Sequence, residues 1–344
     1  MATDLASLKE KKVFVLGATG FIGSAVVKRL GELGLKNIHC LYRSEDKREQ
    51  LCSCVDASSI RFLRGDVSEV DCLRRGVEGA DIVLNASGLA TDWGRKRDIW
   101  QVNVEAPKAI VNMIREMKAR THYIHITSAS VYGFSKVEKT ESSPLAVSDP
   151  FYTASKVAVH SWLREEMRKG HPFPITILAP SIVWGVGDRI YIPGIKDQLR
   201  TGQVFDIGGA EAVDLVHIDD LVDAILLCFS NERSYDQEYI ITGPERFTFR
   251  EYIAKIAEFA ELPPPKRTVP LWLAMGLASA AELSARLASL WGRGDRPLIT
   301  RLQVRLLAMP FRVSNAKAGE ELGYHPQIDF AQGIDGLKEY VREL

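Results

Sequence analysis

Residues 13–23 read Val-Phe-Val-Leu-Gly-Ala-Thr-Gly-Phe-Ile-Gly, and this stretch decides the fold. A short apolar strand runs directly into glycines, and the apolar spacing that follows predicts a helix over 24–33. Glycine allows a tight turn and close backbone approach to a ligand, while a helix N-terminus attracts phosphate. The pattern predicts a dinucleotide site with contacts from Gly17, Thr19, Gly20, Phe21, Ile22 and Gly23.

The rest of the chain alternates short apolar runs with helical patterns, which is typical of βαβ units and a parallel sheet. The helices are predicted over 103–117 and 152–168, and 184–194 has the composition of a loop. The strands are predicted over 12–16, 38–42, 60–64, 82–85, 123–127, 175–178 and 239–242.

We therefore expect an α/β fold, a Rossmann-type doubly wound parallel sheet with a smaller, mainly helical C-terminal lobe. The dinucleotide-binding domain would comprise residues 1–178 and about 214–244. The substrate-binding lobe would comprise residues 179–213 and 245–344.

The composition is that of an ordinary enzyme and excludes several other functions. The 44 basic residues balance 44 acidic ones, so nothing indicates binding to nucleic acid. Cys52 and Cys54 form a lone C-x-C pair, so we expect reduced thiols and no metal site. The N-terminus does not resemble a targeting signal, and the longest apolar stretch, 269–281, is too short to span a bilayer. These features predict a cytoplasmic protein without a transmembrane segment.

The end of the second predicted strand indicates which nicotinamide cofactor binds. Arg43 and the Ser44 hydroxyl stand there, and both suit a 2′-phosphate on the adenosine ribose. Glu45 and Asp46 follow, and either carboxylate could accept a hydrogen bond from the ribose instead. We expect NADP(H) in preference to NAD(H).

Residues after the third and fourth predicted strands complete the cofactor site. The Asp66 carboxylate would accept a hydrogen bond from the adenine amino group, although a turn or helix cap would also explain it. Small residues follow the fourth strand, where the backbone passes close to a ribose. The contacts expected here are Asp66, Val67, Asn85, Ala86 and Ser87.

Tyr152 and Lys156 open a predicted helix at a spacing that places a phenol and an ammonium on one face. The ammonium would lower the pKa of Tyr152 toward neutrality and make it a general acid or base. Ser128, after the fifth strand, can hold the substrate oxygen opposite the tyrosine. A Tyr-x-x-x-Lys pair alone could be an exposed helical pair, but here it follows a nucleotide-binding half. Ser128, Tyr152 and Lys156 are the predicted catalytic residues.

The chain resembles the extended short-chain dehydrogenases/reductases, the NAD-dependent epimerase/dehydratase superfamily, over nearly its whole length. The resemblance rests on the glycine loop, Asp66, the stretch 127–133, and the Tyr152–Lys156 pair. It implies that Ser128 is the catalytic serine, and that Tyr152 and Lys156 also contact the cofactor.

The same resemblance marks three further positions. Asn103 stands where the group often has an asparagine, although a local helix cap would explain it equally well. Pro180 and Ile182, after the sixth strand, are expected to contact the cofactor. His217 is expected to be structural.

Two departures argue against a nucleotide sugar as substrate. Many nucleotide-sugar members have Arg-Pro after the sixth strand, where this chain has Ala179-Pro180. They also tend to carry an arginine where residues 211–214 have none, and burying a diphosphate without cations is unfavourable. The alternatives kept open are a nucleotide-sugar epimerase or dehydratase with tightly bound NAD, and a cofactor-sensing protein without chemistry.

The C-terminal third resembles 3β-hydroxysteroid dehydrogenase-like members, and the chain as a whole is also close to dihydroflavonol reductase-like ones. The predicted function is an NADP(H)-dependent oxidoreductase (EC 1.1.1.-) that interconverts a ketone and a secondary alcohol. The substrate would be apolar, and steroid-, flavonoid- or polyketide-like. Weaker candidates for substrate contact, most of them in expected loops, are Thr91, Trp93, Ser130, Trp184 and Tyr191.

An apolar helical wall is predicted within 269–291. It could cap an apolar substrate, make a peripheral contact with a membrane, or pack onto the main domain or a dimer partner. A homodimer would pair helices near 103–117 and 152–168. The wall residues are Leu271, Trp272, Met275, Leu283, Leu287, Leu290 and Trp291.

Overall fold

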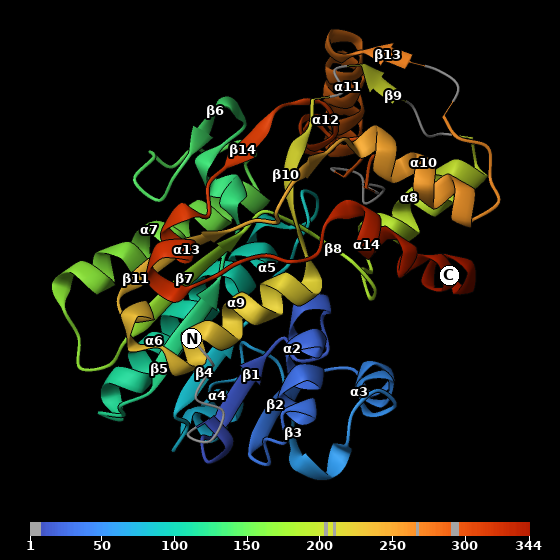
Figure 1. Ribbon diagram of the computed structural model, residues 1–344. Coiled ribbons are helices and arrows are strands. Elements are labelled where there is room, and N and C mark those ends of the chain that lie inside the picture. The colour runs from blue at the N-terminus through green and yellow to red at the C-terminus, as the bar shows by residue number, and fades with distance from the viewer. Residues whose placement is uncertain (1–7, 203–205, 209–210, 266–267, 290–295) are drawn as a thin grey trace.

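The protein is built on a parallel sheet with helices on both faces, and a second lobe lies over one edge of that sheet (Figure 1). The computed structural model describes residues 8–202, 206–208, 211–265, 268–289 and 296–344. The large sheet has seven strands in the order β11-β7-β5-β4-β1-β2-β3, and every pair is parallel. The predicted doubly wound α/β fold is confirmed.

The seven strands occupy the segments predicted as strands, with small shifts at their ends. β1, β4, β5 and β7 are buried at every position, which explains why they are mainly apolar, although β5 also carries the buried His122 and His125. β1 lies between β2 and β4, so the strand order reverses beside β1, and ligands of such sheets bind at that point. The strands are β1 Val13–Leu16, β2 Ile38–Tyr42, β3 Ile60–Arg64, β4 Ile82–Asn85, β5 His122–Ile126, β7 Ile175–Pro180 and β11 Gln237–Ile241.

Two groups of helices cover the sheet. One face is covered by α2 (Phe21–Glu32) and α9 (Ile218–Ser230), which share a buried apolar core with the strands. The other face is covered by α4 (Val70–Val77), α6 (Ala106–Glu116) and α7 (Tyr152–Lys169).

Of the three helices predicted for the dinucleotide-binding domain, two differ slightly from the prediction where they begin. α2 begins at Phe21, ahead of the predicted start, because Gly20 is already its N-cap. The helix predicted over 103–117 is preceded by α5 (Lys96–Trp100) and a π-helical turn at Gln101–Glu105. α7 matches the predicted helix closely.

Small sheets and helices form the second lobe. β12-β10-β8 form one sheet, β9 pairs with β13, and β6 pairs with β14. The strands are β6 Ser135–Lys139, β8 Ile182–Trp184, β9 Asp206–Gly208, β10 Val213–His217, β12 Arg246–Phe247, β13 Thr268–Pro270 and β14 Phe311–Val313. The helices are α8 Tyr191–Arg200, α10 Phe249–Phe259, α11 Leu271–Ser289, α12 Arg301–Ala308, α14 Phe330–Asp335 and α15 Leu337–Glu343.

The boundary between the two predicted domains remains a prediction. Within the segment 214–244, α9 and β11 pack into the core of the large sheet, whereas β10 pairs with β8 in a small sheet. Two further short helices, α3 (Glu45–Cys52) and α13 (Ala316–Leu322), contribute buried side chains to the core that α2 and α9 share with the large sheet.

The prediction of a loop over 184–194 is wrong at both ends of that segment. Trp184 ends β8, and Tyr191 begins α8. Asp188 accepts the backbone N–H groups of Ile190 and Tyr191 at 2.8 and 3.0 Å, which starts the helix. Pro193 lies in the first helical turn, where proline is tolerated.

Candidate active site

The glycine loop between β1 and α2 has the shape that a pyrophosphate requires. Gly17 has a φ of 75°, and a Cβ there would come within 2.7 Å of backbone atoms of Ala86 and Ser87. A Cβ at Gly23 would overlap the carbonyl group of Gly17. Because the N-cap Gly20 has no side chain, no side-chain cap occupies the N–H groups of the first turn of α2. These residues fit a dinucleotide whose pyrophosphate lies at this helix N-terminus.

A strap formed by Gly185–Arg189 lies against the glycine loop, and sequence reasoning missed it. A Cβ at Gly187, where φ is 94°, would lie 3.5 Å from the ring of Phe21. Arg189 Nη1 donates to the carbonyl of Thr19 at 3.1 Å. The exposed guanidinium of Arg189 therefore lies beside the loop that receives phosphate.

The end of β2 brings Arg43 and Asp66 together. Arg43 Nη1 lies 3.2 Å from Asp66 Oδ2, and the Arg43 side chain is 75% exposed. Asp66 Oδ1 accepts the backbone N–H and the hydroxyl of Ser68 at 3.0 and 2.8 Å. Partial burial opposes ionisation, but the hydrogen bonds from Ser68 and Arg43 lower the pKa of Asp66 below its ordinary value. Arg43, which was expected to bind a 2′-phosphate, and Asp66, which was expected to bind adenine, therefore form an ion pair with each other.

Glu45, a candidate for the ribose hydroxyls, is already engaged by protein. Its carboxylate accepts from the Tyr42 hydroxyl at 2.8 Å and from Arg48 Nε at 2.6 Å. The bonds from Arg48 and Tyr42 lower the pKa of Glu45. Ser44 is the N-cap of α3, and its hydroxyl makes no side-chain cap hydrogen bond.

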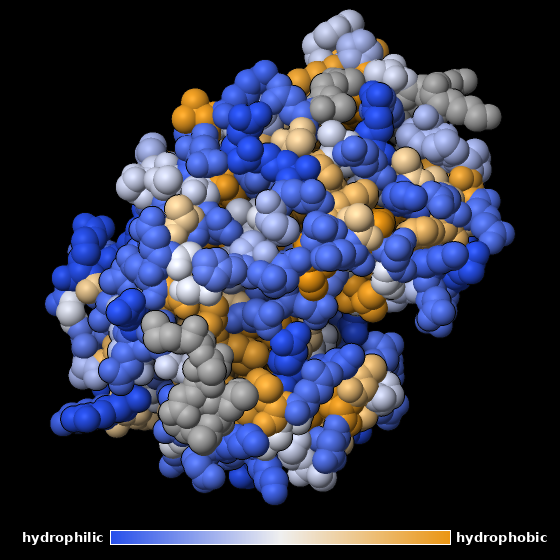
Figure 2. Space-filling model, viewed as in Figure 1, coloured by the Kyte–Doolittle hydropathy of each residue, from blue (hydrophilic) through white to orange (hydrophobic). Residues whose placement is uncertain are grey.

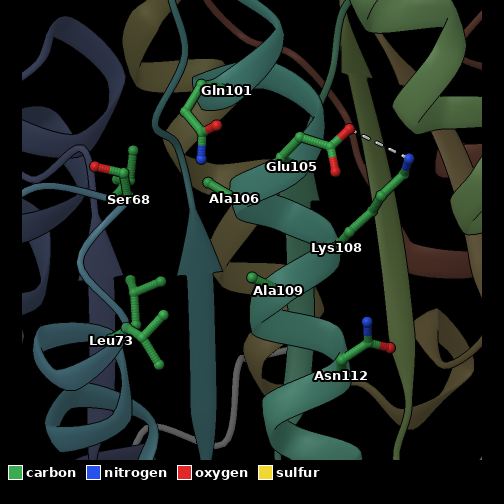
Figure 3. A pocket seen from close by; sticks show the side chains of 10 residues that line it. Ser68, Leu73, Gln101, Glu105, Ala106, Lys108, Ala109 and Asn112 are labelled. Atoms are coloured by element: carbon green, nitrogen blue, oxygen red, sulfur yellow. Dashed lines mark ion pairs between the residues drawn. The ribbon is translucent and has the colours of Figure 1, made fainter.

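A cavity of about 360 Å³ opens beside Val67, between α4 and α6 (Figure 3). Figure 3 shows Ser68 on one side of it and Gln101 on the other, and both carry hydrogen-bonding groups. Glu105 and Lys108 form an ion pair at 3.5 Å along its rim. The cavity adjoins the expected adenine site, and sequence reasoning singled out neither Ser68 nor Gln101.

Asn85 lies behind the cofactor site. It is fully buried, and its Nδ2 donates to the hydroxyl of Tyr123 at 3.0 Å. Its Oδ1 accepts the backbone N–H and the hydroxyl of Ser87 at 3.1 and 2.5 Å. The expected direct contact of Asn85 with the cofactor is not supported, because both ends of its amide are bound to protein and hold Ser87. Pro180 ends β7 and Ile182 lies in β8, and both are buried.

The predicted catalytic residues meet at the carboxyl end of β5 and the start of α7. The Ser128 hydroxyl lies 2.9 Å from Ser130 Oγ and hydrogen-bonds the phenol of Tyr152. Lys156 is 5% exposed, and its Nζ donates to the carbonyl of Ile126 at 3.2 Å. Ser130, a weaker substrate candidate, therefore orients the hydroxyl of Ser128.

The predicted effect of Lys156 on Tyr152 is wrong for the chain alone. Burial raises the pKa of Tyr152; the hydrogen bond from Ser128 lowers it only in part, and the charge of Asp149 raises it further. Burial also lowers the pKa of Lys156 to about 8. The helical spacing is as expected, but the ammonium bonds a backbone carbonyl instead of the phenol. Tyr152 is thus a protonated phenol, as a proton donor must be.

Asp149 fixes the start of α7 and was not predicted. Its Oδ1 accepts the backbone N–H groups of Phe151 and Tyr152, both at 2.8 Å, and its Oδ2 accepts that of Thr153 at 2.8 Å. The signal was available, since an aspartate shortly before a helical run is a usual start signal.

Asn103 is not a local helix cap. It lies in the π-helical turn and is 2% exposed. Its side chain binds the backbone N–H and carbonyl of Leu89 at 2.8 and 3.2 Å, and Ser155 Oγ at 2.9 Å. A Cβ at Gly88 would lie 3.4 Å from Lys156 Nζ and 3.5 Å from Asn103 Oδ1. Asn103 therefore joins the loop after β4 to α7 beside the catalytic lysine.

Two of the weaker substrate candidates lie at different depths. Burial and then the charge of the nearby Tyr152 raise the pKa of Tyr191, which begins α8. Trp184 is 2% exposed, and its ring packs on His217 at 4.9 Å and on Phe247 at 5.3 Å. Trp184 is therefore a core residue, and its prediction as a loop residue that contacts substrate is wrong. His217 accepts the backbone N–H of Asp219 at 3.3 Å as the N-cap of α9, as a structural residue does.

The other two candidates lie in the loop after β4, as expected. The Thr91 hydroxyl donates to the Trp93 carbonyl at 2.7 Å, and the Trp93 ring lies 6.4 Å from that of Phe151. Between them, Asp92 is 9% exposed and accepts from Arg296 at 2.9 Å. This loop is therefore tied both to the start of α7 and to the second lobe.

The predicted apolar wall is divided by the two faces of α11. Figure 1 shows α11 at the far end of the second lobe, and the face shown in Figure 2 is mostly hydrophilic with apolar groups scattered over it. Leu290 and Trp291 lie outside the described residues. Leu271 and Met275 are half-buried against a small core. The other three wall residues are not explained by packing, because their side chains are exposed: Trp272 by 74%, Leu283 by 60% and Leu287 by 56%.

Metal and membrane features were sought in the described part of the chain. It contains no cluster of at least three His, Cys, Asp or Glu side chains that could hold a metal ion. None of its helices combines the length and the apolar character needed to cross a membrane.

The fold and the site define a Rossmann-type enzyme whose serine, tyrosine and lysine lie at the carboxyl edge of the sheet. A model of the NAD dependent epimerase/dehydratase family matches residues 13–242, which is more than half of the chain. The chain belongs to this family, the extended short-chain dehydrogenases/reductases, as predicted, and is an NAD(P)-dependent oxidoreductase.

Its relatives include a reductase and a dehydrogenase. A 2-alkyl-3-oxoalkanoate reductase of Shewanella oneidensis is 23% identical, over 98% of this chain and 88% of the relative. A decarboxylating sterol-4-alpha-carboxylate 3-dehydrogenase of Mus musculus is 24% identical, over 98% and 92%. A solved UDP-glucuronic acid 4-epimerase of Bacillus cereus with NAD superposes with a TM-score of 0.75 at 18% identity, over 96% and 99%, and shows that the fold is shared.

Proposed function

We propose that this enzyme interconverts a ketone and a secondary alcohol on an apolar substrate of steroid-, flavonoid- or polyketide-like character, with NADP(H) as cofactor. The observation that carries the proposal is the half-buried, protonated phenol of Tyr152, which Ser128 hydrogen-bonds and which lies one helical turn from Lys156. The names of two relatives, one acting on 2-alkyl-3-oxoalkanoates and one on a sterol, support ketone and alcohol chemistry on apolar molecules.

The three catalytic side chains divide the work on the substrate oxygen. In the reductive direction Tyr152 donates its phenolic proton to the carbonyl oxygen, and the Ser128 hydroxyl binds the same oxygen. The cofactor, when bound, supplies the hydride. Lys156 carries the positive charge that stabilises the phenolate left on Tyr152, and its burial strengthens that effect. Oxidation of the alcohol uses the same residues in reverse.

Residues of the glycine loop and the strap would hold the cofactor. The first-turn N–H groups of α2, at Phe21, Ile22 and Gly23, would bind the pyrophosphate. Arg189 adds a cation beside Thr19 of that loop.

NADP(H) in preference to NAD(H) is supported at the end of β2. Arg43 is exposed and presents its guanidinium beside Asp66, where a 2′-phosphate would bind both it and the Ser44 hydroxyl. Glu45, which would favour NAD(H), is occupied by Tyr42 and Arg48. A carboxylate that already accepts two hydrogen bonds competes poorly for ribose hydroxyls.

A substrate panel tests the proposal. Hydrophobic ketones and secondary alcohols, including 2-alkyl-3-oxo acids and 3-ketosteroids, would be assayed with NADPH and NADH in parallel. We expect turnover with NADPH on at least one ketone, and slower turnover with NADH. Equal rates with both cofactors would remove the role of Arg43, and no turnover with any member would overturn the proposal.

A nucleotide-sugar epimerase or dehydratase is the second candidate, favoured by the shared fold with such an enzyme. It would purify with bound NAD(H) and convert a nucleotide sugar without net consumption of NADPH. Absorbance of the purified protein at the nicotinamide band distinguishes the two candidates before any substrate is known.

Partners and location rest on weaker features, and we propose them with the function. The outer face of α11 fits the surface of a lipid bilayer, since Glu282, its single acidic residue, is buried and paired with Arg301 at 2.9 Å. A homodimer through α6 and α7 and a cytoplasmic location remain predictions. Light scattering of the purified protein tests the dimer.

A further inference from the structure

The strap Gly185–Arg189 is bonded both to the glycine loop and to α15. Arg189 Nη1 donates to the carbonyl of Thr19 at 3.1 Å. The carbonyl of the preceding residue, Asp188, accepts from the hydroxyl of Tyr340 on α15 at 2.7 Å. Two consecutive residues therefore connect the loop that would receive the pyrophosphate with a helix of the second lobe.

Asp188 also holds the start of α8. It is 2% exposed, and its Oδ1 accepts the backbone N–H groups of Ile190 and Tyr191 at 2.8 and 3.0 Å. Its Oδ2 accepts the backbone N–H of Ile192 at 3.3 Å. A buried carboxylate that loses its hydrogen bonds is strongly unfavourable, so the first turn of α8 has to follow any displacement of Asp188.

α8 and α15 are held to each other as well. Lys196 Nζ, on α8, donates to the carbonyl of Val341, on α15, at 2.7 Å. Ile192, Leu337 and Val341 are 0% exposed and belong to one apolar core. A restraint on the strap therefore reaches both helices, α8 through the carboxylate of Asp188 and α15 through its carbonyl.

Arg189 provides the link to the cofactor. Its side chain is exposed, and a guanidinium has five N–H donors, of which the bond to Thr19 uses one. Thr19 directly precedes Gly20, the N-cap of α2, and the first-turn N–H groups of that helix would bind the pyrophosphate. Hydrogen bonds from a guanidinium to a phosphate oxygen are short and strong, because both partners are charged. A pyrophosphate at this helix end would therefore restrain Arg189 more firmly than the Thr19 carbonyl does alone.

We propose that Arg189 is a positioning residue that couples binding of the cofactor pyrophosphate to the ordering of α8 and α15. The charged contact with bound phosphate restrains the strap, and Asp188 passes that restraint to the first turn of α8 and, through Tyr340, to α15. Tyr191, a candidate substrate contact, begins α8, so this side of the substrate lobe is ordered when the cofactor is bound. The inference rests on the dinucleotide binding of the proposed function and is independent of its ketone and alcohol chemistry.

Hydrogen–deuterium exchange of the intact protein, with and without saturating NADPH, tests the coupling. We expect the backbone amides of α8 and α15 to exchange severalfold more slowly when NADPH is bound. Arg189→Gln should abolish this slowing even at saturating NADPH. It should also raise the Kd of NADPH and that of NADH by about tenfold alike, because both cofactors contain the pyrophosphate and a bond to a charged group is lost. Slowing that persists in Arg189→Gln, or Kd values that do not change, would overturn the proposal.

Two further variants separate the coupling from general effects. Arg200→Gln is the matched control, since Arg200 is an exposed arginine at the end of α8, and it should change neither the Kd values nor the slowing. The double variant Tyr340→Phe with Lys196→Met removes both hydrogen bonds that connect α15 to the strap and to α8, and it keeps the ring of residue 340. It should bind NADPH as the wild type does and keep the slowing in α8, but lose the slowing in α15. An α15 that still responds to NADPH would overturn the route through Tyr340.

The proposed function can fail separately from this coupling. None of these measurements needs a ketone or an alcohol, so an enzyme without ketoreductase activity could still show the NADPH-dependent slowing, which would support the coupling alone. Turnover of a ketone by an enzyme in which NADPH leaves exchange in α8 unchanged would support the proposed function and overturn the coupling.

Discussion

The carboxylate of Asp149 accepts the backbone N–H of Tyr152 at 2.8 Å, so an acidic side chain fixes the helix turn that carries the catalytic phenol. Asp188 stands in the same relation to Tyr191, whose backbone N–H it accepts at 3.0 Å. Tyr152 and Tyr191 therefore both begin helices whose first turns are closed by aspartates. In the case of Asp149 the negative charge also raises the pKa of the phenol it positions. Asp149 thus fixes the backbone of the proposed proton donor and adds to the effect of burial, which is the main cause of the raised pKa of Tyr152.

Replacing Asp149 with alanine should lower both stability and turnover. Losing an N-cap acceptor costs about 0.5–2 kcal/mol, and we expect the free energy of unfolding to fall by that amount. We expect kcat to fall about tenfold, because the first turn of α7 no longer fixes Tyr152. Asp329→Ala removes the cap of α14, so it should lose stability without losing turnover. A normal kcat in Asp149→Ala would contradict the positioning role.

Tyr152→Phe removes the proton donor and keeps the ring. We expect kcat to fall by about 10²–10⁴, the usual contribution of a positioned general acid. NADPH binding, followed by fluorescence titration, should stay within about twofold, because the phenol acts on the substrate oxygen. Ser128→Ala should lose less, since Tyr152 can still donate its proton. Full turnover by Tyr152→Phe would sink the catalytic assignment.

Arg43→Leu should reduce the preference for NADPH over NADH. A hydrogen bond to a charged group is worth about 1.5–3 kcal/mol, so the ratio of the two kcat/KM values should fall about tenfold or more. Arg61, an exposed arginine on β3, is the control, and Arg61→Leu should leave the ratio unchanged. If Arg43→Leu does not alter the ratio of the kcat/KM values for NADPH and NADH, another group binds the 2′-phosphate.

Much of the fold and the centre of the site could be predicted because their causes are local. β1 and β4 are buried on both faces, so their sequences are unbroken apolar runs that stand out from the helices. The catalytic set could be predicted because Ser128 follows a strand and Tyr152 and Lys156 open a helix. Parallel strands bring such positions to one edge of a sheet.

What the sequence could not show depends on contacts between distant segments. Arg189 reaches the carbonyl of Thr19 across 170 residues of sequence, and no local pattern marks that contact. In the sequence, Trp184 follows the sixth predicted strand as a loop residue would. In the structure it ends β8, and packing against Phe247 buries it. Lys156 has the predicted spacing, but its ammonium bonds a strand carbonyl that helical periodicity cannot reveal.

The exposed apolar face of α11 should bind lipid. The wild-type protein should co-sediment with vesicles that contain anionic phospholipid, since Trp272 and Leu277 are 74% and 55% exposed. Changing both to serine should abolish co-sedimentation and leave the melting temperature unchanged, because neither side chain packs in the core. Val137→Ser, at a residue 69% exposed on β6, is the control and should bind as the wild type does. Binding that survives the double change would exclude α11 as the contact.

Burial of Lys156 should make the active enzyme less stable than an inactive variant. Its pKa falls from 10.5 to about 8 because folding buries the ammonium. Between those values the unfolded chain holds a proton that the folded chain has released, so stability rises with pH across that window. Below it, both states are charged and burial costs on the order of 3 kcal/mol. Lys156→Met should therefore raise the free energy of unfolding at pH 7, by about 1–3 kcal/mol once the lost bond to Ile126 is allowed for.

The gain in Lys156→Met should shrink as the pH rises through 10.5, because above that value the lysine becomes neutral in the unfolded chain as well as in the folded one. Urea unfolding at pH 7 and pH 10 measures the difference, and Lys28→Met on the exposed side of α2 controls for the general effect of losing a lysine. A variant less stable than the wild type at pH 7 would show that the bond to Ile126 outweighs burial. The lysine would then stabilise the fold, and its retention would need no catalytic explanation.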